Sequence, residues 1–286
     1  MSSAILVRGL TKSYHQSKGG VVNAVRGIDL DVETGEIFAL LGPNGAGKTS
    51  VIEILEGYRN RDGGALSVLG EDPAQTNIPA WRNRVGIVLQ STKDAADLTV
   101  GEILNHFAKY YSRPRDVDEV IAAVGLTEKR NARGEHLSGG QRRRLDVALG
   151  IIGNPELLFL DEPTTGFDPE ARHSFWELIR SLRENGTTIL MSTHYLDEAE
   201  VLADRVAVMN HGIIVDCQTP DKLGGRDRDK TNIRWRENGV QRHHCTDSPT
   251  EFIRTLTERI PGEIPELKIT KPTLEEIYLQ MIGFQA

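Results

Sequence analysis

The sequence predicts an α/β fold with a mainly parallel β-sheet. From residue 37 onward, short apolar runs of strand length alternate with segments of helical periodicity, which is typical of parallel strands joined by helices. The run at 37–41 is apolar at every position, as expected of a strand covered on both faces. Between residues 98 and 147 the pattern is helical throughout, so we expect a helical insertion subdomain there.

Before this region, β-type runs at 5–7 and 28–32 predict an N-terminal antiparallel β subdomain, with a turn signal at Thr34-Gly35 ahead of the run at 37–41. Further strands are expected at 65–69, 85–89, 157–160, 187–191 and 206–209, and helices at 48–56, 100–111, 116–124, from 139, at 169–183 and at 196–203. We expect residues 1–220 to form one domain. Residues 221–286, which begin with a polar segment, are expected to form a small α+β appendage.

Composition narrows the classes of function. The chain has 286 residues and a net charge of −7, from 34 basic and 41 acidic side chains, which speaks against a nucleic-acid binder. The net charge does not exclude a local basic patch such as Arg142-Arg143-Arg144. Cys217 and Cys245 stand far apart, which indicates neither a disulfide framework nor a zinc site and fits a reducing cytoplasm. No apolar run is long enough to span a bilayer, so we expect any membrane attachment to be made through another protein.

A glycine-rich loop follows the run at 37–41 and precedes a helix. Backbone N–H groups of such a loop surround phosphate oxygens, the lysine reaches the β- and γ-phosphates, and the hydroxyl after it reaches Mg²⁺. A plain glycine-rich turn is the alternative, but the strand before and the helix after favour phosphate binding. The predicted ATP-binding residues here are Gly42, Pro43, Asn44, Gly45, Ala46, Gly47, Lys48, Thr49 and Ser50.

Two carboxylates end the apolar run at 157–160. Asp161 is predicted to hold Mg²⁺ together with Thr49, and Glu162 to orient or deprotonate the attacking water. Many strands end in acidic residues, so this signal is weak alone. Together with the glycine-rich loop it predicts a nucleotide-hydrolysing site.

A second helix start also suits an anion. Ser138, Gly139, Gly140 and Gln141 stand at the beginning of the helix expected from residue 139. A serine-capped helix without a ligand is the alternative. Two phosphate-facing helix starts in a chain with one phosphate-binding loop call for either two ligands or a partner chain.

In this order, the motifs resemble the ATP-binding cassette (ABC) family over residues 4–216. The resemblance implies an ABC ATPase core that binds ATP and Mg²⁺. It also implies a head-to-tail dimer of two copies, in which the segment LSGGQ at 137–141 contacts the γ-phosphate of ATP on the other copy.

The resemblance assigns roles to further residues. It implies that Tyr14 stacks on adenine, that Gln90 senses Mg²⁺ and water, that Asp168 lies at the dimer contact, and that His194 contacts the γ-phosphate. Phe167 departs from the family, which usually has leucine there.

The segments STHYLDEAE at 192–200 and PTLEEIYL at 272–279 resemble more closely the ATPase subunits of bacterial drug and antibiotic exporters of the daunorubicin-resistance type. This implies a transmembrane permease as partner and a cytoplasmic position at the inner face of the membrane. An importer subunit is the first alternative, and a soluble cassette acting on nucleic acid or ribosomes is the second. We expect no nucleic-acid partner.

Overall fold

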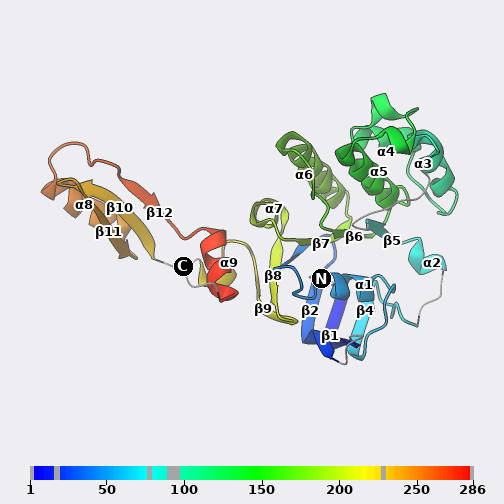
Figure 1. The fold of residues 1–286 in the computed structure, drawn as a ribbon, viewed down its shortest axis with the longest axis horizontal. Helices are drawn as coiled ribbons and strands as arrows, with labels where there is room; N and C mark the ends of the chain where they lie inside the picture. The colour runs from blue at the N-terminus through cyan, green and yellow to red at the C-terminus, as the bar shows by residue number, and fades with distance from the viewer. Residues whose placement is uncertain (1–2, 16–19, 76–78, 89–96, 227–229, 284–286) are drawn as a thin grey trace. The chain divides into compact units, whose positions relative to one another are not determined.

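The computed structural model describes residues 3–15, 20–75, 79–88, 97–226 and 230–283 (Figure 1). The chain divides into two compact units, residues 1–215 and 216–286. The domain boundary expected between residues 220 and 221 stays a prediction. Over the described ranges, no helix is both long enough and apolar enough to cross a membrane.

A six-stranded sheet forms the centre of the first unit, and its strand order is β5-β6-β7-β3-β8-β9. The ladders from β5 to β8 are parallel, as predicted. Every residue of β3, β6 and β7 is buried, which explains the continuous apolar runs. The strands are β3 (Ile37–Leu41), β5 (Val85–Val88), β6 (Leu157–Asp161), β7 (Thr188–Thr193), β8 (Arg205–Asn210) and β9 (Ile213–Gln218).

The antiparallel sheet of the first unit has the order β2-β1-β4. It comprises β1 (Ser3–His15), β2 (Val21–Glu33) and β4 (Gly63–Val68). The first two strands are much longer than the apolar runs that predicted them. Their outer halves are polar and partly exposed, so the apolar pattern marked only the segments that pack on the core.

Helices α1 (Lys48–Leu55), α2 (Pro79–Arg82), α6 (Pro169–Glu184) and α7 (Leu196–Leu202) belong to the same unit. The expected helical subdomain contains α3 (Val100–Ala108), α4 (Val117–Ala123) and α5 (Gly139–Ile151). Figure 1 shows these three helices gathered at the top right, away from the antiparallel sheet at the bottom. A capping box of Thr99 and Glu102 begins α3, and the side chain of Asp116 caps α4.

The second unit contains a three-stranded antiparallel sheet of order β11-β10-β12, as well as two helices. One side of the sheet packs against α8 around a small core of Ile233, Trp235, Leu256 and Ile264. Its elements are β10 (Thr231–Glu237), β11 (Val240–Thr246), α8 (Pro249–Arg259), β12 (Lys268–Thr270) and α9 (Leu274–Met281). Strand β11 was not predicted, because its side chains are polar and exposed.

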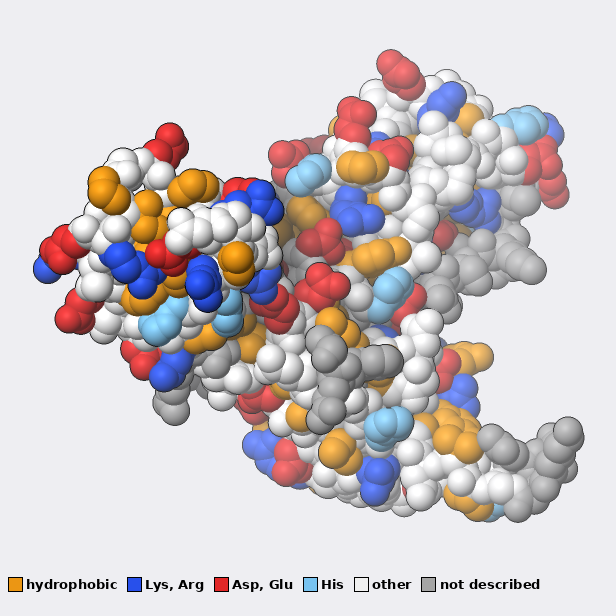
Figure 2. Space-filling model, turned by 60° about the vertical axis from the view of Figure 1, so that its left-hand side comes forward, with side chains coloured by type: hydrophobic (Ala, Val, Ile, Leu, Met, Phe, Trp, Pro, Cys, Tyr) orange, Lys and Arg blue, Asp and Glu red, His pale blue; other side chains and the backbone are white. Residues whose placement is uncertain are grey.

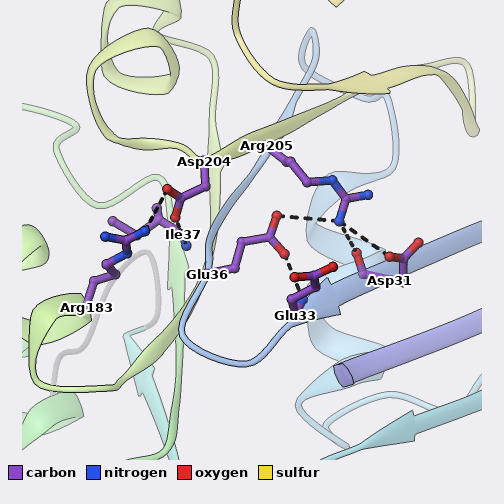
Figure 3. A network of polar contacts seen from close by, with 7 residues as sticks. All are labelled: Asp31, Glu33, Glu36, Ile37, Arg183, Asp204 and Arg205. Carbon is purple, nitrogen blue, oxygen red and sulfur yellow. Dashed lines mark hydrogen bonds and ion pairs between the residues drawn. The ribbon is translucent and has the colours of Figure 1, made fainter. Parts of the chain in front are cut away.

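Ion pairs and hydrogen bonds join the two sheets of the first unit at the amino end of β3 (Figure 3). Arg205 of β8 lies 3.4 Å from Asp31 of β2 and 3.5 Å from Glu36. Asp204 accepts a hydrogen bond of 2.9 Å from the backbone N–H of Ile37 and another of 2.9 Å from Arg183 of α6. These contacts fix the start of β3, the strand that leads into the glycine-rich loop.

Asp204→Ala should therefore destabilise the first unit. The buried N–H of Ile37 loses a charged acceptor, which costs about 1–3 kcal/mol. The control Arg183→Ala removes only the half-exposed ion pair and should cost under about 1 kcal/mol. Urea unfolding of both variants measures the difference, and equal losses would show that the Ile37 contact contributes nothing beyond the ion pair.

Candidate functional site

The predicted site residues follow the carboxyl ends of neighbouring parallel strands. The glycine-rich loop follows β3, Asp161 and Glu162 end β6, and His194 comes directly after β7. Parallel strands present their carboxyl ends at one edge of the sheet, which is where ligands bind in open α/β folds. The sheet order places β7 between β6 and β3, so the three segments are brought together.

Two glycines of the loop are required by close packing. A Cβ atom at Gly42 would lie 2.3 Å from the carbonyl oxygen of Met209, and one at Gly47 would lie 2.2 Å from that of Ala24. Gly47 also has a φ of 105°, which side chains rarely allow, and it is the N-cap of α1. The loop thus holds the N-terminus of α1 open to an anion, because no side chain covers it.

Lys48 is the first residue of α1 and is buried. Its ammonium donates to the carbonyl oxygens of Gly42 at 2.7 Å and Pro43 at 3.3 Å. Burial lowers the pKa of Lys48, and the nearby carboxylates of Glu162 and Asp161 oppose this shift. The loop and the acidic pair therefore form one electrostatic site.

Ser192 of β7 organises the acidic pair. Its hydroxyl donates to Oδ1 of Asp161, and its Oγ accepts from the backbone N–H of Glu162 at 3.1 Å. One side chain thus holds both the orientation of the first carboxylate and the backbone of the second. The sequence analysis assigned no role to Ser192, whose partners lie 30 and 31 residues earlier in the chain.

Glu162 and His194, two predicted catalytic residues, lie in contact. Oε1 of Glu162 lies 3.3 Å from Nδ1 of His194, and both side chains are partly open to solvent. Glu162 has a φ of 47°, a conformation uncommon for residues other than glycine and frequent at functional sites. A carboxylate and an imidazole in contact can share a proton or orient a water molecule.

Arg143 of α5 is buried and does not belong to a surface patch. Its guanidinium donates to the carbonyl oxygens of Asp161 at 2.7 Å and Pro163 at 3.0 Å. Burial lowers the pKa of Arg143, and the carboxylates of Asp146, Asp161 and Glu162 oppose the shift. The helix that begins at the LSGGQ segment is thereby bonded to the loop that carries Glu162.

The LSGGQ segment begins α5 with a capping box. The N–H of Gln141 donates to Oγ of Ser138 at 3.3 Å, and the N–H of Ser138 donates to Oε1 of Gln141 at 3.1 Å. A Cβ atom at Gly139 or Gly140 would meet no atom of the described residues within 4 Å. Packing against the described part of the chain therefore does not require glycine at either position.

Tyr14 of β1 lies beside α1, where its hydroxyl is 3.0 Å from Oγ of Ser50. The guanidinium of Arg59 is 5.2 Å from the centre of its ring, and the ammonium of Lys12 is 5.6 Å away. The structure thus places the predicted adenine contact next to the first turn of the phosphate-binding helix.

Asp168 and Phe167 make contacts within the chain that do not involve the glycine-rich loop or the acidic pair. Asp168 caps α6 by accepting from the N–H of Ala171 at 2.7 Å. Phe167 is buried with its ring at right angles to Phe175, so the departure from leucine is accommodated by aromatic packing. Gln90 lies outside the described residues.

Comparisons with known proteins agree with this architecture. The model of the ABC transporter family matches residues 25–165. The daunorubicin/doxorubicin resistance ATP-binding protein DrrA of Streptomyces peucetius is 34% identical, and the match covers 99% of this chain and 93% of that protein. The Nod factor export ATP-binding protein I of Rhizobium sp. (strain N33) is 35% identical, with 98% and 97% covered.

Solved structures show the same fold. An ATP-binding subunit of an ABC transporter is 25% identical and superposes with a TM-score of 0.68, covering 77% of this chain and 91% of that one. Fold and site together define a nucleotide-hydrolysing cassette. The chain belongs to the ABC transporter family and is one of its ATP-binding subunits, which are ATPases.

Ser192→Ala tests the organisation of the acidic pair. We expect kcat to fall about tenfold with little change in KM, because Asp161 and Glu162 lose their shared anchor (a tenfold change corresponds to about 1.4 kcal/mol). Steady-state ATP hydrolysis measures both constants.

Thr188→Val is the matched control for Ser192→Ala. The hydroxyl of Thr188 is buried at the other end of β7, where it accepts from the N–H of Gly35 at 3.0 Å. This variant should lose about 1–3 kcal/mol of stability and keep its kcat. An unchanged kcat for Ser192→Ala would contradict the assigned anchor.

Proposed function

We propose that the chain is the ATPase subunit of an exporter of drugs, antibiotics or other lipophilic compounds. Support comes from the names of its relatives, which describe resistance to daunorubicin and export of Nod factors. Because the chain covers more than nine-tenths of both relatives, their role can apply to the whole chain.

ATP would be held by the glycine-rich loop, with the ammonium of Lys48 at the β- and γ-phosphates. The hydroxyl of Thr49 and the carboxylate of Asp161 fit Mg²⁺, which prefers oxygen ligands. Ser192 engages Oδ1 of Asp161 and keeps the carboxylate turned in one direction. When bound, Mg²⁺ neutralises charge on the phosphates.

Glu162 would orient and deprotonate the attacking water, and His194 would hold the γ-phosphate and stabilise Glu162. Their contact of 3.3 Å supports this division of roles. General-base assistance of this kind contributes about 10²–10⁴-fold to the rate. The role of Gln90 toward Mg²⁺ and water remains the prediction made from the sequence.

We base the proposal of an ATP site shared between two copies on the open space around Gly139 and Gly140. A glycine pair that no described residue of its own chain requires is explained when another molecule approaches the backbone closely. We therefore infer that the LSGGQ segment caps ATP bound to a second copy, in a head-to-tail dimer with Asp168 at the contact. Among the solved relatives of the fold is a cassette described as a dimer with ADP and Pi, at 21% identity and a TM-score of 0.69.

A transmembrane permease would receive the motion and hold the chain at the cytoplasmic face of the membrane. Ile87 of β5 and Leu98 and Tyr110 of the helical subdomain expose apolar surface that such a partner would cover. Nucleic acid is a poorer partner, because acidic and basic side chains are interspersed on the face shown in Figure 2.

Lys48→Ala and Gly139→Asp test the shared site by complementation. The first removes the phosphate-facing charge, and the second places a carboxylate where the γ-phosphate of the partner would lie. Alone, either variant could build only dimers with two damaged sites, so neither should dimerise with ATP. Mixed, one of the two sites combines an intact Lys48 with an intact LSGGQ segment, so ATP-dependent dimerisation should return.

Size exclusion is the measurement, with Glu162→Gln in both chains to slow turnover. Glu162→Gln alone is the positive control, and each double variant alone should stay monomeric. No gain in ATP-dependent dimer on mixing, while Glu162→Gln alone dimerises under the same conditions, would favour a site complete within one chain.

Tyr14→Ala should weaken ATP binding by removing the stacking face for adenine. Base–aromatic stacking is worth about 1–3 kcal/mol, which corresponds to about 5- to 150-fold in Kd. Tyr14→Phe loses only the hydroxyl contact with Ser50 and should bind nearly as the wild type does. Titration with a fluorescent ATP analogue measures the Kd of both variants. An unchanged Kd for Tyr14→Ala would contradict the proposed stacking of Tyr14 on adenine.

A further inference from the structure

His194 lies in a backbone turn directly after β7. Successive side chains of a strand point to opposite faces, but here the N–H of Tyr195 donates to Oγ1 of Thr193 at 2.9 Å and turns the chain. In this turn the two consecutive rings lie together. The centres of the His194 and Tyr195 rings are 4.1 Å apart, and the ring planes make an angle of 37°. The imidazole therefore packs against an aromatic ring.

Tyr195 is an uncommon residue for its position in the fold. It is the N-cap of α7, where Ser, Thr, Asp and Asn are favoured because their side-chain oxygens accept from the first N–H groups of the helix. Among the described residues, the tyrosine side chain makes no such capping bond. The start of the helix therefore does not explain a tyrosine here, whereas the ring contact with His194 does.

Arg172 of α6 contacts the tyrosine ring. Its guanidinium carbon lies 4.9 Å from the ring centre, a distance at which a cation is attracted to the face of the ring. Nη1 of Arg172 also lies 3.1 Å from Oδ2 of Asp197 in α7, so an ion pair fixes the guanidinium beside the ring. A row of contacts thus runs from α6 through Arg172 and Tyr195 to His194.

The contact between His194 and Glu162 is a weak restraint by itself. The distance from Nδ1 to Oε1 is 3.3 Å, and the two side chains are 35% and 16% exposed. Polar pairs that are open to solvent hold side chains weakly, and exposed side chains change rotamer within nanoseconds. A packed neighbouring ring restricts the rotation of the imidazole and leaves both of its nitrogen atoms available.

We propose that Tyr195 is a positioning residue that keeps the imidazole of His194 turned toward Glu162, and that Arg172 holds the tyrosine ring in place. The inference rests on the proposed roles of Glu162 and His194 in hydrolysis. Tyr195 acts through His194, so the rate of hydrolysis depends on the tyrosine ring while the affinity for ATP does not.

Tyr195→Leu tests this role by removing the ring and keeping an apolar side chain. An offset of about 1 Å in a reacting group can cost about 100-fold in rate. For an imidazole that is only loosened, we expect kcat to fall about tenfold with the KM for ATP unchanged. Tyr195→Phe keeps the ring and should keep kcat. Arg172→Gln removes the cation and should lower kcat about threefold.

Tyr58→Leu is the matched control for Tyr195→Leu. Tyr58 is 78% exposed, so the same change of side chain is made outside the site. This variant should keep both kcat and KM. Thermal unfolding of all variants, followed in parallel, should give unfolding temperatures within about 4 °C of the wild type.

NMR spectroscopy of the ring contact gives a second readout that needs no turnover. The full chain is isotope-labelled in its eight histidines and observed without nucleotide. The resonance that disappears in His194→Ala identifies His194. The ring current of Tyr195 displaces this resonance, so Tyr195→Leu should move it toward the position of exposed histidines. Tyr195→Phe should leave it near its wild-type position.

Three results would overturn the proposal. The first is a wild-type kcat in Tyr195→Leu, and the second is an unmoved His194 resonance in that variant. The third is a loss of kcat that Tyr195→Phe shares, or that comes with an unfolding temperature lowered by more than about 4 °C, which would assign the loss to the hydroxyl or to the fold. A wild-type kcat in Arg172→Gln would contradict the role of Arg172.

His194→Ala, assayed in parallel, keeps the two proposals apart. If it keeps its kcat, the proposed role of His194 in hydrolysis fails. If it lowers kcat while Tyr195→Leu does not, only the inference about Tyr195 fails.

Discussion

The parallel pairing of β6, β7 and β3 is the constraint on which the site depends. The three strands are buried on both faces, so their backbone groups must bond to one another in a fixed register. That register sets Asp161 beside Ser192 and Leu41 beside Thr193. The segments that leave the strands are therefore gathered at one edge, although more than a hundred residues separate the glycine-rich loop from the acidic pair.

Once gathered, these groups stabilise one another. Burial lowers the pKa of Lys48, and the carboxylates of Glu162 and Asp161 oppose this shift. Ser192 and Arg143 then hold the acidic segment, one through the side chain of Asp161 and the other through its backbone carbonyl. Because Arg143 is on the LSGGQ helix, its hydrogen bonds join that helix to the loop of Glu162.

The sequence predicted the features that are local. The glycine-rich loop, the acidic pair and the capped helix at Ser138 each lie within a short segment whose pattern carries its own chemistry. Ser192 and Arg143 were missed because their partners are 31 and 18 residues away and nothing in the local pattern names them. The polar halves of β1 and β2 and all of β11 were not predicted for a related reason. Exposed strands are held by backbone hydrogen bonds to the neighbouring strand and not by apolar burial, so their sequences lack an apolar pattern.

The two ends of β3 show how the fold tolerates a costly site. At the carboxyl edge of the sheet, Glu162 after β6 adopts a φ of 47°, which for a side chain other than glycine costs on the order of 1–3 kcal/mol, and Lys48 after β3 is a buried ionisable group. At the amino end of β3, Asp204, Arg205 and Glu36 join both sheets and α6 to the strand (Figure 3). These charged contacts stabilise the sheet whose opposite edge carries the strained residue. The stability of the sheet and the strain of the site are thus parts of one arrangement.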